Sequence, residues 1–373
     1  MLLVSEPIVG KDEKAALSEV VDCGWITMGD RVRAFEVAFA EEHNAPDAVA
    51  VSSCTAALHL LLVGLGVGPG DEVLVPSLTF VATANCVLYA GATPIFVDIE
   101  SLDSPLMSLQ DAALKCTTKT RAVILMHYAG YLADRDAWRE FADARGLLLL
   151  EDAAHAAGVA GAGGFGDGAA FSFYGNKNMT TAEGGIVIAK DEGALDRIRQ
   201  MRGHGMTSGT LQRLKSRAAT YDVTMLGYNY RMDELRAAIG IAQLKKLKTW
   251  NEKRKALTHM YRRALEAQCP AVRVPLAARD NSSHHIMPIV LPPDAERQSV
   301  MARMRDDEIQ TTIHYPPAHQ LSFYRSLYPS VQLEETEEFA RRELTLPLHP
   351  RMEEGQVEAV CYALAKSLMR RNY

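Results

Sequence analysis

The sequence predicts an α/β fold, in which a large domain with a mostly parallel sheet precedes a smaller C-terminal α+β domain. Through the first two thirds of the chain, short and nearly continuous apolar runs alternate with helical patterns. This alternation is typical of parallel strands that helices cover on both faces. The chain has 373 residues, which is more than one hydrophobic core usually serves.

The elements can be assigned in order along the chain. The first strand, DAVAVSS at 47–53, runs directly into a helix at 54–66. Further strands of the large domain are expected at 71–77, 92–99, 121–128, 146–152, 168–174 and 184–189. A long helical pattern that starts in RMDEL can carry the chain into the small domain, so we place the boundary near Trp250, giving domains of 1–249 and 250–373. The small domain should contain a strand at 283–291 and a helix around 295–307.

Composition limits the class of protein. The formal net charge is −6, whereas a nucleic-acid binder usually shows a basic stripe. No apolar run approaches the ~18 residues that a membrane span requires, and the N-terminus lacks the basic region of a signal peptide. The six cysteines are scattered without metal-ligand spacing. We therefore expect a cytoplasmic protein with reduced thiols, no metal, and neither nucleic acid nor membrane as a partner.

Several strands end in polar residues, and the ligand crevice of an open α/β sheet lies beyond the carboxyl ends of its strands. The segment SSCTAAL ends the first strand and begins a helix. Its free N–H groups, the helix dipole and the hydroxyls of Ser53 and Thr55 suit a phosphate. The same residues also form ordinary N-caps, which is the commoner case for such a segment taken alone.

A second polar segment, LLLLEDAAHA, places Asp152 directly after a buried strand. A partly desolvated carboxylate needs a cation or hydrogen-bond donors, and either a protonated pyridine nitrogen or a structural salt bridge meets that need. His155 lies three residues further on and shares a face with Asp152 if a helix begins there. A lone histidine is more often structural than catalytic.

Lys177 stands between two asparagines in SFYGNKNMTTAEGG. Most lysines are simply solvated, but an amine that attacks a carbonyl must be partly neutral, and burial lowers its pKa. The sequence combines an anion-binding helix start, an acid at a strand end and a lysine after another strand. Together they describe a pyridoxal phosphate (PLP) site, in which the helix holds the phosphate, Asp152 keeps the ring nitrogen protonated and Lys177 forms the Schiff base.

With these motifs the chain resembles a known family, the DegT/DnrJ/EryC1/StrS sugar aminotransferases. They are PLP enzymes of the aspartate-aminotransferase fold (fold type I). The resemblance extends over nearly the whole length, and several ordered motifs at family spacing are more specific than any one of them. The matching stretches are GWITMGDRVRAFE (24–36), VSSCTAALHLLL (51–62), residues 70–98, EDAAHAAG (151–158), FSFYGNKNMTTAEGG (171–185) and GYNYRMDELRAAIGIAQL (227–244).

The resemblance implies cofactor roles for matching positions. It places Thr55, Ala56 and Ser172 at the phosphate, Phe80 on the face of the pyridine, Asp152 at the ring nitrogen, His155 near the ring oxygen, and Lys177 as Schiff-base lysine and proton carrier. It places Asn229 at the phosphate of the neighbouring subunit's cofactor, which implies a homodimer with shared active sites, although on spacing alone a turn asparagine is as good an explanation.

Substrate roles are implied less directly. The stretch TTIHYPPAHQLSFY (311–324) resembles a family segment that turns back to the active site. Its His314, Tyr315 and His319 are candidate contacts to a sugar nucleotide, with core or surface histidines as the alternative. Arg31 and Arg231 are candidate partners of the diphosphate.

The reaction expected from the resemblance is transamination, because lysine stands where sugar dehydratases of the family carry histidine. L-glutamate is the family's usual donor. GWITMG resembles the GWITTG-like segment of members acting at C4 of nucleotide-linked 4-keto-6-deoxyhexoses, although Met28 departs from the common threonine. C3 aminotransferases and aminocyclitol-forming enzymes share most of these motifs, so they remain alternatives.

Two other classes of protein are alternatives. A metal-dependent hydrolase could draw on the set His127, Asp152, His155, His284, His285 and His314, but no HExxH or comparable spacing is present. A non-catalytic regulatory protein of the same fold is expected to have lost Lys177 or Asp152, and both are present.

Overall fold

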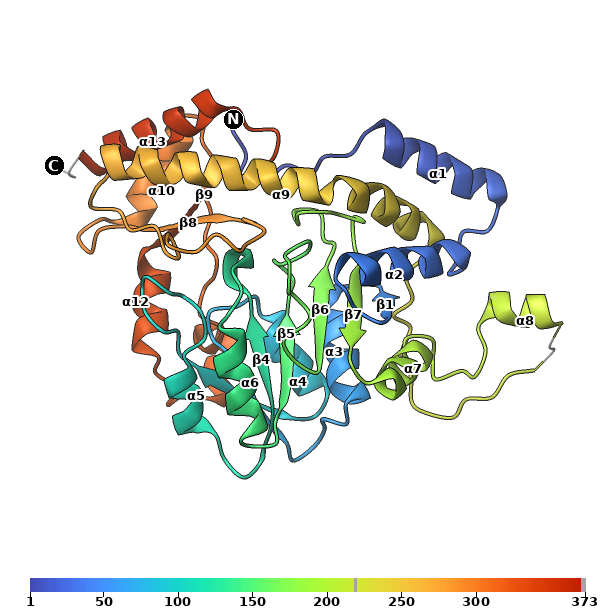
Figure 1. Cartoon of the computed structure of the whole chain (residues 1–373). Coiled ribbons are helices and arrows are strands. Elements are labelled where there is room, and N and C mark those ends of the chain that lie inside the picture. Colours follow the sequence, from blue (N-terminus) through green and yellow to red (C-terminus); the bar gives the residue numbers. More distant parts are fainter. Residues whose placement is uncertain (218–219, 370–373) are drawn as a thin grey trace.

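The computed structural model describes residues 1–217 and 220–369 and is built around a seven-stranded sheet (Figure 1). The strand order is β1-β7-β6-β5-β4-β2-β3. Among the described strands of this sheet, β7 is antiparallel to its neighbours β1 and β6, and all other neighbouring strands are parallel. The expectation of a mostly parallel sheet is confirmed. The strands are β1 (Ala48–Val51), β2 (Glu72–Pro76), β3 (Thr93–Val97), β4 (Thr120–Met126), β5 (Leu148–Asp152), β6 (Gly168–Ser172) and β7 (Gly185–Ala189).

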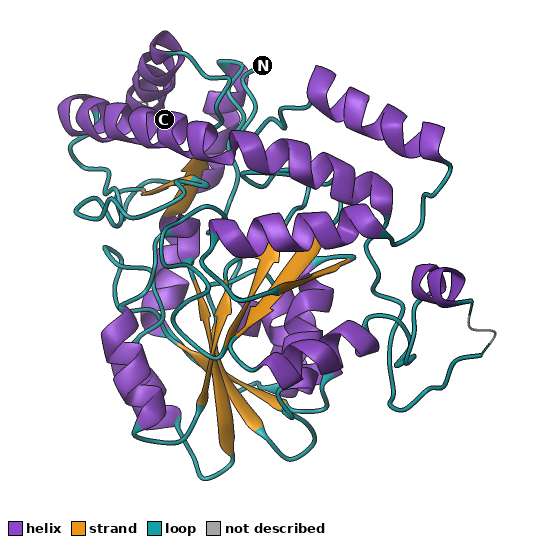
Figure 2. Ribbon diagram, turned by 45° about the vertical axis from the view of Figure 1, so that its right-hand side comes forward, coloured by secondary structure: helices purple, strands orange, loops and turns teal. Residues whose placement is uncertain are grey.

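Helices cover both faces of the sheet (Figure 2). One core packs the sheet against α2, α6 and the first half of α9, and the other packs it against α3, α4 and α7. The strands are apolar on both sides because both faces are covered. The helices before the small domain are α1 (Lys11–Cys23), α2 (Asp30–Glu42), α3 (Cys54–Gly64), α4 (Ala82–Tyr89), α5 (Leu109–Lys115), α6 (Arg135–Asp143), α7 (Glu192–Met201), α8 (Thr210–Ser216) and α9 (Glu234–Gln268).

A smaller unit with its own core follows along α9, which runs across the whole molecule (Figure 1). It contains the antiparallel strands β8 (Met287–Val290) and β9 (Glu343–Leu346), as the expected α+β character requires. The remaining elements of the C-terminal third are α10 (Arg297–Asp306), the 3-10 turn η2 (Ala318–Gln320), α11 (Ser322–Leu327), α12 (Glu334–Arg342) and α13 (Glu354–Met369). A second 3-10 turn, η1 (Tyr128–Gly130), follows β4 in the large domain.

The large domain and the small unit do not separate at a single position of the sequence. Trp250 lies within the unbroken helix α9. Leu2 pairs with Ile309 of the small unit, and Tyr324 of α11 is buried in a core of the large sheet. The boundary at 249/250 therefore stays a prediction.

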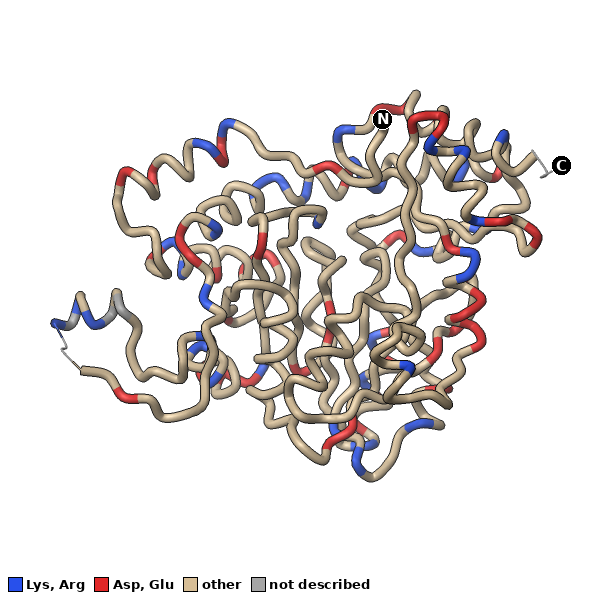
Figure 3. The backbone as a smooth tube through the Cα atoms, turned by 180° about the vertical axis from the view of Figure 1, so that it is seen from behind, with Lys and Arg blue, Asp and Glu red and all other residues tan. Residues whose placement is uncertain are grey.

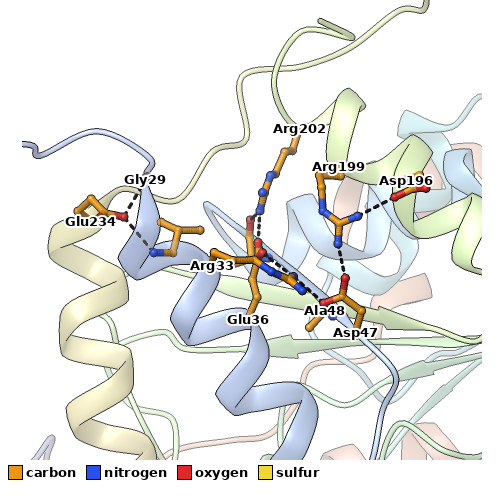
Figure 4. Close-up of polar contacts among 11 residues, drawn as sticks. Gly29, Arg33, Glu36, Asp47, Ala48, Asp196, Arg199, Arg202 and Glu234 are labelled. Carbon is orange, nitrogen blue, oxygen red and sulfur yellow. Dashed lines mark hydrogen bonds and ion pairs between the residues drawn. The ribbon is translucent and has the colours of Figure 1, made fainter. Parts of the chain in front are cut away.

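Buried polar contacts fasten α2 to the elements around β1 (Figure 4). The Glu234 carboxylate accepts hydrogen bonds from the N–H groups of Gly29 (2.9 Å) and Val32 (2.9 Å) at the start of α2. Arg202, which follows α7, forms a buried ion pair with Glu36 of α2. Such a carboxylate satisfies N–H groups that a helix start leaves without partners. These contacts hold the segment that precedes α2, residues 24–29, beside the start of α9.

Residues 205–217 and 220–226, which we call the arm, project from the body of the molecule and include α8 (Figures 1 and 2). Lys and Arg are interspersed with Asp and Glu along the drawn chain (Figure 3). Within the described ranges, no helix is both long enough and apolar enough to cross a membrane.

Candidate active site

The ends of several parallel strands bring the predicted residues to one edge of the sheet. Asp152 is the last residue of β5 and lies in register between Met126 of β4 and Ala170 of β6. Ser172 is the last residue of the neighbouring strand β6. Because parallel strands end at the same edge, these side chains share a region with the start of α3, which follows β1. The edge of the sheet at which the sequence predicts a ligand site therefore has the predicted polar residues along it.

Asp152 is the acid at the centre of this edge, with only 4% of its surface exposed. Its carboxylate accepts a hydrogen bond from the Thr83 hydroxyl (2.6 Å) and one from the Ala154 N–H (3.1 Å). Burial raises its pKa, and the bond from Thr83 opposes that rise. Among the described residues this buried carboxylate has two neutral donors and no ion pair, so it is suited to a cationic N–H partner.

Lys177 lies in a turn closed by a hydrogen bond from its own N–H to the Tyr174 carbonyl (3.0 Å). In the described part of the chain, its amine has no hydrogen bond or ion pair. Burial lowers its pKa to about 8, while the nearby groups Cys54 and Asp152 act in the opposite direction. The amine is therefore neutral in an appreciable fraction of molecules near pH 8, as a nucleophile or proton carrier must be.

The start of α3 combines a normal N-cap with free donors. The Ser53 hydroxyl accepts a hydrogen bond from the Ala56 N–H (3.1 Å), so the simple capping interpretation is correct for Ala56. The N–H and hydroxyl of Thr55 have no partner among the described residues. A Cβ at Gly185 would come within 2.6 Å of the Cys54 nitrogen, so only glycine lets β7 pass beneath this helix start. Ser172 accepts a long contact from the Tyr174 N–H (3.4 Å).

His155 follows Asp152 in a turn and not in a helix, which corrects the expectation of a shared helical face. Its ring is buried, and its Nε2 lies 2.8 Å from the Tyr315 hydroxyl. His285 packs on it with ring centroids 4.3 Å apart. Burial and the charge of Lys177 hold the pKa of His155 well below its usual range, so it is neutral. The ring of Phe80 is 58% exposed and lies 6.2 Å from that of Tyr315, which leaves a face free for an aromatic ligand.

The other predicted residues occupy more varied places. His314 donates its N–H to Glu343 (2.9 Å), and its Nδ1 lies 2.9 Å from the Thr345 hydroxyl. His319 is buried, with its ring nitrogens 2.6 Å from the Ser77 hydroxyl and 3.1 Å from Glu337, which are the contacts of a structural histidine.

The two predicted arginines and Asn229 lie outside the core. The guanidinium of Arg31 lies 3.6 Å from Glu19 in a half-exposed pair. Arg231 pairs through its backbone with Val51, next to the start of α3. Asn229 is exposed and pairs through its backbone with Gly203. Its side chain has no partner in the described ranges.

Sequence reasoning missed two residues that hold the site together. Thr83 holds the Asp152 carboxylate, and Asn178 anchors the turn of Lys177 through its amide, which donates to Asn251 (2.7 Å) and to the Ser283 carbonyl (2.8 Å). The second asparagine of GNKN was visible in the sequence, but its partners lie more than 70 residues away. No local pattern indicates such a contact.

These residues fit a pyridoxal phosphate cofactor. The free donors of Thr55 suit its phosphate, the carboxylate of Asp152 suits its ring nitrogen, and the unpaired amine of Lys177 suits its aldehyde. His155 adds a buried Nδ1 without a partner. Across residues 1–217 and 220–369, no group of three or more His, Cys, Asp or Glu is placed to hold a metal ion.

A lysine amine without a partner among the described residues, a buried aspartate and a helix start with free donors lie at one edge of a seven-stranded sheet, as the site of a PLP-dependent enzyme requires. Comparison with known proteins agrees, because residues 7–365 match the DegT/DnrJ/EryC1/StrS aminotransferase family. The chain belongs to this family.

Three solved structures illustrate the similarity. PseC of Helicobacter pylori, an aminotransferase involved in the biosynthesis of pseudoaminic acid, is 27% identical, with a TM-score of 0.91 over 98% of this chain and 99% of that one. The sugar aminotransferase CalS13 of Micromonospora echinospora is 26% identical, with a TM-score of 0.89 over 98% and 100% of the two chains. NtdA of Bacillus subtilis, solved with bound PMP, is 27% identical, with a TM-score of 0.86 over 95% and 81%.

The expected fold type I, the aminotransferase class and the PLP cofactor are thereby confirmed. The roles of individual residues remain predictions that rest on the geometry described above.

Proposed function

We propose that this enzyme transfers an amino group from L-glutamate to C4 of a nucleoside-diphosphate-linked 4-keto-6-deoxyhexose. The observation that carries the transaminase part is the amine of Lys177, which is unpaired among the described residues and has its pKa lowered to about 8. The sugar substrate is supported by relatives such as CalS13, whose substrate class is a sugar. The C4 position is supported by the GWITMG segment.

Each side chain has a defined task in this proposal. Pyridoxal phosphate supplies an electron-withdrawing ring that stabilises negative charge at the carbon losing its proton. Asp152 holds the proton on the ring nitrogen, and Thr83 keeps the carboxylate in place. Lys177 would be the base that accepts the proton lost from the donor's α-carbon and the acid that gives a proton back later in the reaction. Thr55 and the start of α3 hold the phosphate, and Phe80 covers one face of the ring.

The diphosphate of the substrate needs cationic or amide donors. Arg231 is the better placed of the two predicted arginines, because its backbone pairs with Val51 beside α3, whereas the Arg31 side chain is already 3.6 Å from Glu19. Three small-domain rings lie beside His155, those of His285 (centroids 4.3 Å apart), Tyr315 (6.0 Å) and His314 (6.4 Å). Loss of an arginine contact should raise KM more than it lowers kcat, because the diphosphate is bound equally before and during the reaction.

The experiment that tests the proposal offers the holoenzyme L-glutamate and a panel of acceptors. The panel contains 4-keto-6-deoxy and 3-keto nucleoside-diphosphate sugars and a free keto-cyclitol, and 2-oxoglutarate formation is followed. We expect turnover with the 4-keto sugar alone. Turnover of only the 3-keto sugar or only the cyclitol would contradict amination at C4, and no turnover with any acceptor would contradict the sugar substrate itself.

We further propose a homodimer whose two active sites share residues. The arm supports this proposal, because it projects from the body and exposes large apolar side chains, among them Leu214 (65%), Tyr221 (56%) and Leu226 (79%). Exposed apolar side chains on a projecting segment are available for burial against a second subunit. Asn229 follows the arm directly and is exposed, as a residue that reaches a neighbouring subunit must be.

Mixing inactive variants tests the shared site. If Asn229 acts across the interface, a Lys177→Ala chain and an Asn229→Ala chain form a heterodimer with both lesions in one site and none in the other, so activity returns. Lys177→Ala mixed with Asp152→Asn is the matched control, because each site then keeps one lesion. Full activity of Asn229→Ala alone, or an active monomer in sedimentation, would contradict the proposal.

A cytoplasmic location is part of the same proposal. All six cysteines are free, and Cys86, Cys269 and Cys361 are buried. Unpaired cysteines are typical of a reducing compartment.

A further inference from the structure

The segment that returns from the small unit to the active site ends in a contact that no motif indicated. Tyr315 reaches across 160 residues of sequence to place its hydroxyl 2.8 Å from Nε2 of His155. The other ring nitrogen of His155, Nδ1, is buried and has no partner among the described residues. Nε2 of His155 is therefore hydrogen-bonded within the protein, and Nδ1 is free to bind a ligand atom.

Tyr315 is held in place through its neighbour His314. The His314 N–H donates to the Glu343 carboxyl (2.9 Å), and the Tyr128 hydroxyl donates to the His314 carbonyl (2.6 Å). The His314 ring is anchored to the Thr345 hydroxyl (2.9 Å), which in turn donates to Glu343 (2.5 Å). Backbone and side chain of His314 are thus fixed by both domains, so Tyr315 has little freedom to turn away from His155.

The chemistry of the Tyr315–His155 pair favours one direction of the hydrogen bond. Both groups are neutral, because burial raises the pKa of Tyr315 and lowers that of His155. A phenol is a stronger donor than a neutral imidazole N–H, and an imidazole nitrogen is a stronger acceptor than a phenol oxygen. Tyr315 therefore donates its O–H to Nε2, and no other acceptor for this O–H is found in the described ranges.

We propose that Tyr315 is a positioning residue that fixes His155 as the tautomer carrying its proton on Nδ1. A buried N–H without an acceptor is costly, and an oxygen of the ligand that accepts from Nδ1 would remove this cost. The inference rests on the proposed function only in giving His155 a place near the ring oxygen of the cofactor, to which this N–H donates. Setting a histidine tautomer through the bond at its other nitrogen is a general device of enzyme sites.

The tautomer can be read directly in the cofactor-free protein. Histidines are labelled with ¹⁵N, long-range ¹H–¹⁵N correlations are recorded at neutral pH, and His155→Gln identifies the signal of His155. In the unmodified chain we expect the proton on Nδ1. In Tyr315→Phe we expect a substantial shift toward the Nε2–H form. A proton on Nε2 in the unmodified chain, or an unchanged tautomer in Tyr315→Phe, would overturn the proposal.

Kinetics supply a second readout. In the holoenzyme, Tyr315→Phe should lower kcat about tenfold and leave both KM values within about twofold, because the lost contact orients a catalytic group and does not bind substrate. Tyr261→Phe is the matched control, since the buried Tyr261 donates to the Pro347 carbonyl (2.8 Å) within the small unit. The tautomer is measured without cofactor or sugar, so a failed acceptor panel refutes the proposed function and leaves this inference testable.

Discussion

The two halves of the active site are built in different ways. The half that belongs to the large domain is assembled from strand ends and the turns that follow them, so Asp152, Lys177 and Thr55 each lie in a short motif. The half contributed by the small unit reaches the site through contacts between distant residues, such as Tyr128 with His314 and His155 with Tyr315. We propose that the first half contains the groups that act on the cofactor and that the second half orients one of them.

This difference leads to a graded expectation for mutations. Changes in the strand-end half should abolish or strongly reduce chemistry, whereas changes to supporting hydrogen bonds should have moderate effects. The predictions below test this gradation from its strongest member to its weakest.

The largest effect is expected for Lys177→Ala. Proton transfer by a positioned group contributes up to about 10⁴-fold, so kcat should fall by about that factor while folding and non-covalent cofactor binding persist. The exposed Lys190 at the end of β7 offers a matched control, and Lys190→Ala should retain normal turnover. Measurable transamination by Lys177→Ala at more than a few per cent would contradict the assigned role.

Asp152→Asn should reduce kcat by roughly 10²- to 10³-fold, because it keeps the size of the side chain but removes the charge that favours a protonated ring nitrogen. The variant should fold and bind PLP, which circular dichroism and the cofactor absorbance can check. Near-normal turnover would mean that Asp152 is only structural.

Thr83→Val removes the 2.6 Å hydrogen bond to Asp152 and nearly preserves the shape of the side chain. A hydrogen bond to a charged group contributes about 1.5–3 kcal/mol, so a decrease in kcat of about 10- to 100-fold is expected. A loss as large as that of Asp152→Asn would show that Thr83 does more than support the carboxylate, and no loss would remove it from the site.

The smallest effect is a shift in pH dependence. The pKa of Lys177 in the cofactor-free protein is lowered to about 8 by burial, and the Asp152 carboxylate opposes this by favouring the ammonium form. The rate of PLP capture should therefore rise with pH below about 8 and level off above it. Asp152→Asn should move the midpoint to lower pH, because the opposing charge is gone. Rapid-mixing absorbance measurements would detect a shift in the wrong direction.

The strands of the large sheet could be predicted from the sequence within a few residues at each end, because their apolar runs are bounded by clear turn and helix signals. The acid, the lysine and the helix start could be predicted because each has a local context that the chemistry requires. Thr83, Asn178 and the support of Tyr315 could not, since their partners are set by packing between segments far apart in sequence. His319 is the opposite case. Its motif suggested a substrate contact, but the two nitrogens of its buried ring lie at hydrogen-bond distance from Ser77 and Glu337.

The central claim is that the amine of Lys177 is the group that binds the cofactor covalently. Its most direct test is borohydride reduction of the purified holoenzyme, followed by digestion and mass spectrometry of the peptides. The account predicts that the reduced cofactor is attached to the peptide containing Lys177 and that Lys177→Ala yields no labelled peptide. Attachment to any other lysine, or label that persists in Lys177→Ala, would contradict it.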